Sequence, residues 1–193
     1  MSDTKQSIPY AVQKTNKPSI EEVIASCFEG DLQKSALGFA AFMRENNTPF
    51  KLFTSTTRSQ MACHKKERLC QIIVYGEDDW KHVNYHQPGD PPYWNLIPVL
   101  THLNDYKDTV ISQNWQPVLW DNVFYCAHDP RSPLAGKGCS PNKKCAGGRS
   151  ITILDKTIDG ICYGRTNPII RNPDEAMVEI VKELLVMEVE ARV

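Results

Sequence analysis

The sequence lacks a long apolar run and has almost no net charge. No stretch among its 193 residues approaches the roughly 20 apolar residues needed to cross a bilayer. The residues before Ser19 are too polar for a signal peptide. Its 22 Lys and Arg against 23 Asp and Glu give a formal net charge of -1, which provides no field for a polyanion. We therefore expect a cytoplasmic protein, with neither a membrane nor nucleic acid as a favoured partner.

Signatures of catalysis and of cofactor binding are also missing. The sequence contains no acid/base pair, catalytic triad, metal-hydrolase motif or nucleotide loop that stands out. The glycine-rich segment at 146–150 precedes a predicted strand, whereas a phosphate loop precedes a helix. We predict no nucleotide cofactor and favour a binding or regulatory role, for an unknown small molecule or protein, over an enzymatic one. Because catalytic groups need not be adjacent in sequence, the enzyme class stays open.

Hydrophobic patterning predicts an α+β fold in which antiparallel sheet is covered by helices. Ser19 and Glu22 have capping-box spacing and open a helix, and a second helix follows to about residue 45. Alternating segments between residues 50 and 86 indicate three or four antiparallel strands. Further predicted elements are helices at 94–103 and 115–123, a hairpin at 150–162 turning at Asp155 and Lys156, and a final amphipathic helix capped by Asn172.

The composition divides the chain into three parts. Residues 1–18 show no periodicity and are expected to form a flexible arm. Residues 19–88 form a half with helices and sheet, and the proline-rich break at 87–94 separates it from residues 89–193. Arg-Ser pairs precede one hairpin ending at Cys70 and another ending at Cys162, so the two halves are loosely similar. The break marks either a domain boundary or a long loop within one compact domain.

Seven cysteines are the most distinctive residues of the chain. Reduced thiols are normal in the cytoplasm, so a disulfide framework is not expected. The segment after Cys126 is rich in Gly, Pro, Ser and Lys and holds two further cysteines, and zinc is a common organiser of such loops. The sequence therefore predicts a zinc site, although the spacings match no strong zinc pattern. Its candidate ligands are Cys126, His128, Cys139, Cys145 and Cys162.

Two other readings of these residues stay open. Lys143 and Lys144 favour the thiolate of Cys145, so Cys139 or Cys145 is a candidate nucleophile or redox thiol, with His128 as a base. Alternatively, the protein is a structural or interaction protein without metal, whose aromatic side chains serve a partner surface.

Several smaller clusters have simpler interpretations. Cys70 and Cys162 sit in strand patterns, where free cysteine is commonly a small buried residue. The segment CHKKERLC at 63–70 indicates an exposed hairpin turn more than a second metal site. His82 and His86 are too far apart on a predicted strand to bind one ion together.

A resemblance extends over most of residues 27–190. The segments WDNVFYC, GGRSITILDKTIDGIC and NPDEAMVEIVKELL, with a Gly/Pro/Cys loop between the first two, resemble those of a group of uncharacterised bacterial proteins. In that group a second cysteine often follows the first at C-x-x-C spacing, where this chain has Asp129. The resemblance implies no activity.

Overall fold

The computed structural model describes residues 7–52, 59–76, 91–132, 134–135 and 147–192. They form an α+β structure with two compact units. One unit comprises Met1–Val99 with Arg171–Val193, and the other comprises Leu100–Ile170. We call the first the sheet unit and the second the hairpin unit. The boundary predicted at residue 88 lies outside the described residues.

The sheet unit is built on a five-stranded sheet with the strand order β1-β2-β3-β4-β7. Three antiparallel pairings join the first four strands in chain order, β1 with β2, β2 with β3 and β3 with β4. The turn between the second and third strands has positive φ at Lys65 and Lys66, as an exposed two-residue turn requires. The strands are β1 (Lys51–Leu52), β2 (Ser59–His64), β3 (Glu67–Tyr75), β4 (Tyr93–Pro98) and β7 (Ile170–Arg171).

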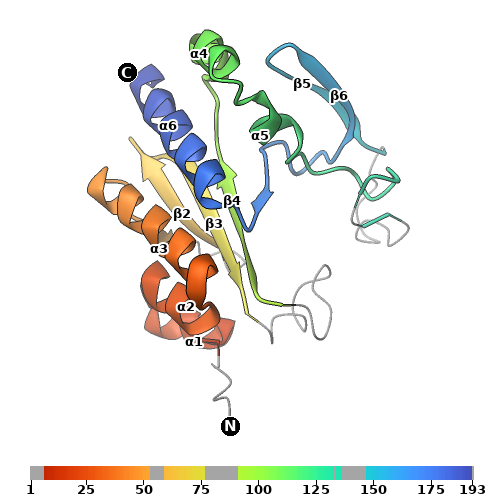
Figure 1. Ribbon diagram of the computed structural model, residues 1–193. Coiled ribbons are helices and arrows are strands. Elements are labelled where there is room, and N and C mark those ends of the chain that lie inside the picture. The colour runs from red at the N-terminus through yellow and green to blue at the C-terminus, as the bar shows by residue number, and fades with distance from the viewer. Residues whose placement is uncertain (1–6, 53–58, 77–90, 133, 136–146, 193) are drawn as a thin grey trace. The chain divides into compact units, whose positions relative to one another are not determined.

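Helices α2 (Ile20–Cys27), α3 (Gly30–Glu45) and α6 (Glu175–Ala191) pack on this sheet (Figure 1). The predicted capping box of α2 is present: the Ser19 side chain accepts from the Glu22 amide, and the Glu22 carboxylate accepts from the Ser19 amide. Phe39 of α3 is fully buried, and its ring centroid lies 6.3 Å from that of Trp94 in β4. The apolar faces of the helices and one face of the sheet therefore form the core.

The structure corrects the prediction of a helix at 94–103. Residues 93–98 form β4 instead and pair with residues 70–75 of β3. Trp94 and Leu96 alternate with Asn95 along the strand, so the two apolar residues face the core. Trp94 and Ile97 are three residues apart, which is also the spacing of residues on one face of a helix. In the strand their side chains lie on opposite faces of the sheet.

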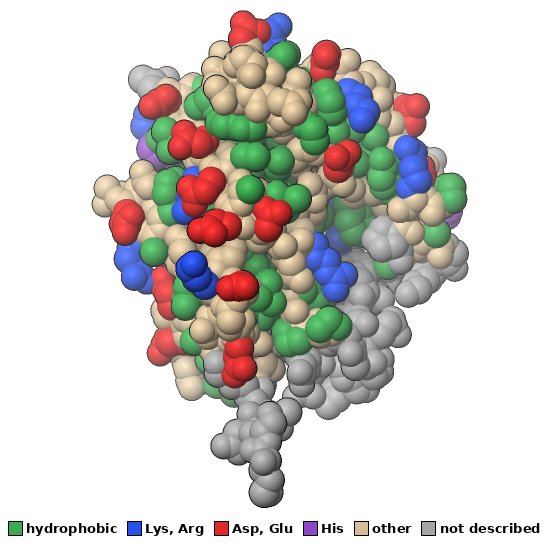
Figure 2. Space-filling view, in the orientation of Figure 1, with side chains coloured by type: hydrophobic (Ala, Val, Ile, Leu, Met, Phe, Trp, Pro, Cys, Tyr) green, Lys and Arg blue, Asp and Glu red, His purple; other side chains and the backbone are tan. Residues whose placement is uncertain are grey.

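The start of α6 also differs from the prediction. Asp174, not Asn172, caps the helix, and its side chain accepts a hydrogen bond from the Met177 amide at 2.8 Å. Asn172 pairs with β4 instead: its amide donates to the Trp94 carbonyl, and its side-chain oxygen accepts from the Trp94 amide. Carboxylates alternate with hydrophobic side chains along the outer surface of the helix (Figure 2).

The sequence predicted a flexible arm for residues 1–18, whereas the structure has helix α1 at Tyr10–Asn16. Gln13 is buried, and its side-chain amide donates to the Ile8 carbonyl at 2.8 Å. Ser7 packs so closely on Gly76 that a Cβ at Gly76 would overlap it. The segment after residue 6 thus contributes to the packing of the sheet unit.

The hairpin unit contains short helices and one β-hairpin. Helix α5 ends at Trp120, earlier than predicted, because the Asn122 side chain donates to the Val118 carbonyl and ends the helix. The hairpin turns at residues 154–155, one residue before the predicted turn. The elements are η2 (Leu103–Tyr106), α4 (Lys107–Ser112), α5 (Gln116–Trp120), β5 (Arg149–Ile153) and β6 (Lys156–Ile161).

Candidate functional site

Two cysteines of the hairpin unit lie on one short β ladder. Residues 124–126 pair antiparallel with residues 160–162 through amide-to-carbonyl hydrogen bonds of 2.7 and 2.9 Å. In this register Cys126 is opposite residue 160, and Cys162 is its diagonal neighbour. Because side chains alternate along each strand, the two thiols lie on the same face of the ladder. The pairing therefore brings together two cysteines that are far apart in sequence.

Glycines make room around Cys126, which is fully buried. Gly148 has a φ of +90°, and a Cβ there would lie 3.2 Å from the Cys126 Cβ and 3.1 Å from the Gly160 backbone. Residue 148 follows the cysteine-rich segment, and Cys126 precedes it. Both described flanks of that segment therefore meet at one of the two thiols.

The turn after Cys126 is held by Asp129 and Arg131. The Arg131 side chain donates from Nε and Nη2 to the two carboxylate oxygens of Asp129, at 2.8 and 2.7 Å. The Arg131 amide donates to the same carboxylate, and Nη2 also donates to the Asp159 carbonyl of β6 at 2.9 Å. We call this arrangement the Asp129–Arg131 clasp. The hydrogen bonds from the Arg131 side chain are the main reason that the pKa of Asp129 falls to about 2, so the carboxylate stays ionised at neutral pH.

Replacing Gly160 with alanine is expected to open this clasp. Gly160 has a φ of +80°, and an added Cβ would overlap the Asp129 carboxylate and lie 3.2 Å from Arg131 Nη2. Left-handed backbone strain and the clash together should lower the free energy of unfolding by about 2 kcal/mol, measured by urea denaturation. Gly164→Ala is the matched control, since nothing lies within 4 Å of its added Cβ. Equal stability of the two variants would contradict the importance of the clasp.

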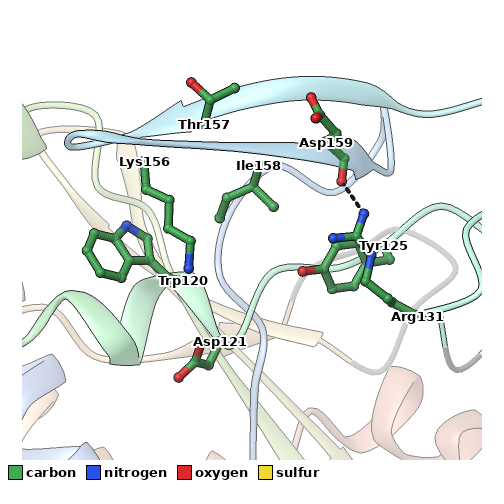
Figure 3. A pocket seen from close by; sticks show the side chains of 8 residues that line it. All are labelled: Trp120, Asp121, Tyr125, Arg131, Lys156, Thr157, Ile158 and Asp159. Carbon is green, nitrogen blue, oxygen red and sulfur yellow. Dashed lines mark hydrogen bonds between the residues drawn. The ribbon is translucent and has the colours of Figure 1, made fainter.

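A pocket of about 400 Å³ adjoins the clasp and opens to solvent. Figure 3 shows Lys156 and Ile158 of β6 pointing into it, while Thr157 and the carboxylate of Asp159 point away. Arg131 lies on one side of the pocket and Trp120 on the other. Its lining residues are Trp120, Asp121, Tyr125, Arg131, Lys156, Thr157, Ile158 and Asp159.

The structure places only part of the predicted zinc site. Cys126 is buried and Cys162 half-buried on the shared ladder, whereas His128 is exposed. Cys139 and Cys145 lie outside the described residues. Within the described ranges, no three or more His, Cys, Asp or Glu side chains gather as a metal-binding group. Of the three candidate ligands in the described ranges, the structure brings Cys126 and Cys162 together on one ladder and leaves His128 exposed.

The structure describes one of the two smaller clusters, the segment at 63–70. Cys70 is fully buried on β3 and Cys63 is exposed on β2, so the segment at 63–70 is a hairpin turn, as predicted. Burial raises the pKa of the Cys70 thiol far above its ordinary value, which disfavours the reactive thiolate form. His82 and His86 lie outside the described residues.

Sequence reasoning missed the residues of the pocket and the clasp. Asp129 is followed by Pro130, a turn signal in which the Asp side chain accepts a nearby backbone amide, and that signal was available in the sequence. The alternation of Lys156 and Ile158 on the second strand of the predicted hairpin was available as well. The sequence did not indicate which other segments of the chain lie opposite the Lys156 and Ile158 side chains and close the pocket.

Comparison with known proteins gives no family. No protein-family model, no curated protein and no solved structure matches the chain. The resemblance to uncharacterised bacterial proteins therefore stays a prediction. In the described part of the chain, no helix combines the length and the apolar character that crossing a membrane requires.

Proposed function

We propose that the hairpin unit is a ligand-binding module whose cysteine-rich segment is organised by a zinc ion. The observation that carries the proposal is the position of Cys126 and Cys162 on one face of the same ladder. Diagonal neighbours in an antiparallel pair are about 7–8 Å apart at Cα and closer at their side chains. Two thiolates so placed are suited to reach one ion, at the usual Zn–S distance of about 2.3 Å.

Structural zinc sites need four ligands, and cysteine is the preferred type. We assign the two remaining positions to Cys139 and Cys145, on the basis of the sequence, because both belong to the segment whose flanks meet at Cys126. Four thiolates complete the tetrahedral set, so the exposed His128 is not required as a ligand.

The small size of the hairpin unit supports the same proposal. A unit of about 70 residues has a limited core, and proteins of that size commonly rely on a metal or on disulfides. Among the described cysteines no disulfide is present. Only one hairpin and three short helical segments are described between residues 100 and 170, so a metal would add a large share of the stability.

The test is the zinc content of untagged protein purified without chelators. We expect about one zinc ion per chain in the wild type and a loss of most of it in Cys162→Ser, because one of four thiolates is removed. Cys63→Ser is the matched control, since Cys63 is an exposed cysteine of the sheet unit. A Cys162→Ser variant that retains the full zinc content would contradict the ligand assignment. Wild-type protein without zinc, but with one fast-reacting thiol, would favour the thiol enzyme instead.

A further inference from the structure

We propose that the pocket beside the Asp129–Arg131 clasp binds a small organic anion. The bound molecule would carry one carboxylate or phosphate group, placed between Lys156 and Arg131, and an apolar part packed on Ile158. This inference names the ligand class of the binding module proposed above and rests on that role. All of its residues are described, and the zinc ion contributes none of its contacts.

The first support is a lysine that is held in place and forms no ion pair with any carboxylate in the described part of the chain. Lys156 Nζ lies 4.8 Å from the centroid of the Trp120 ring, and no ion pair joins it to any described residue. The Trp120 ring is itself fixed, because its Nε1 donates to the Ile153 carbonyl at 3.1 Å. The cation–π contact therefore orients the ammonium group toward the pocket, where it is available to an anion.

The second support is the Nη1 donor of Arg131, for which the described residues supply no acceptor. Nε and Nη2 are occupied by Asp129 and by the Asp159 carbonyl, which fixes the plane of the guanidinium. Nη1 makes no hydrogen bond with the described residues, and the guanidinium lies 4.1 Å from the centroid of the Tyr125 ring. A guanidinium fixed in this way loses little side-chain entropy when it binds an anion.

The remaining lining residues determine what else the ligand can carry. Ile158 is 5% exposed and lies between the two cations in Figure 3, so it offers an apolar floor. Asp121 lines the pocket on the side away from Arg131, and its charge disfavours a second anionic group on the ligand. A volume of about 400 Å³ is within the usual range for small-molecule sites.

The experiment titrates phenyl phosphate and benzoate into the protein and follows amide chemical shifts by NMR. We expect saturable shifts at pocket residues with either anion, and none with benzyl alcohol, which has the apolar part without the charge. Lys156→Met should weaken binding about tenfold, while Lys107→Met, the replacement of an exposed lysine in α4, should leave it unchanged. Asp121→Asn should strengthen binding a few-fold.

Two results would overturn the inference. One is a wild-type protein that shows no saturable shifts with either anion, and the other is Lys156→Met binding as tightly as the wild type. Preference between the two anions shows whether the site takes a phosphate or a carboxylate. Zinc content is measured on the same samples: zinc-free protein that still binds phenyl phosphate contradicts only the metal, whereas zinc-loaded protein that does not bind contradicts only the pocket.

Discussion

Removing zinc with a chelator is expected to unfold the hairpin of the hairpin unit while leaving the sheet unit folded. Zinc binding in small metal-organised domains contributes much of the folding free energy. Amide hydrogen exchange in β5 and β6 should therefore accelerate by about 100-fold or more, which corresponds to a loss of about 3 kcal/mol. Amides of β3 should keep their protection, since the core of the sheet unit contains none of the proposed ligands.

Hydrogen exchange in the two units is compared within one sample, so the sheet unit acts as an internal control for the hairpin unit. Readdition of zinc should restore the protection of β5 and β6, and magnesium should not, because Mg²⁺ prefers oxygen ligands. Unchanged exchange in the hairpin after complete removal of the metal would show that zinc does not organise this unit.

Replacing Glu188 with leucine should lower the free energy of unfolding by about 3–5 kcal/mol, because the buried Arg192 guanidinium loses its 2.9 Å ion pair and exposed Glu67, at 3.9 Å, replaces little of that interaction. Glu188 is fully buried in α6, and its carboxylate accepts from Arg192 Nε at 2.9 Å. Arg192 Nη2 also donates to the carbonyls of Arg68 and Val99, at 3.2 and 3.1 Å. The pair thus joins the end of α6 to the main chain at β3 and just after β4.

A double-mutant cycle measured by chemical denaturation tests this role. Replacing both residues with apolar side chains of similar size, Glu188→Leu with Arg192→Met, should recover much of the stability lost in the single variant. Lys182→Met is the control for an ion pair whose acidic partner is open to solvent: Lys182 pairs with Glu179 at 2.6 Å, Glu179 is exposed, and the loss should be below about 1 kcal/mol. Additive effects of the two buried replacements would contradict the coupling.

Local signals predicted much of the fold. The capping box at Ser19 and Glu22 and the second helix, which ends at residue 45, were confirmed because each depends on residues within a few turns of one helix. The β2–β3 hairpin was confirmed for a similar reason, since its strands are adjacent in sequence.

Tertiary contacts overrode the local signals elsewhere. Trp94 and Ile97 have helical spacing, but hydrogen bonding to β3 made their segment a strand with both faces partly covered. Asn172 is a good helix cap by itself, yet pairing with the backbone of Trp94 fixes it outside the helix. In both cases the deciding partner is distant in sequence, so no local pattern predicts it.

The candidate site likewise combines features that local sequence indicates with features that depend on distant contacts. Composition drew attention to Cys126 and Cys162, but their alignment on one ladder depends on a pairing that only the folded chain shows. The pocket depends on α5, a turn and β6 together, and its cations are single residues in otherwise ordinary segments. Such a site has no linear signature in the sequence.

The most direct test of the proposed metal centre is X-ray absorption spectroscopy at the zinc edge on the purified protein. The proposal predicts a single shell of four sulfur atoms at about 2.3 Å from the zinc, from the four assigned cysteines. A shell composed mainly of nitrogen or oxygen atoms at about 2.0–2.1 Å would contradict the four-cysteine site at Cys126, Cys139, Cys145 and Cys162.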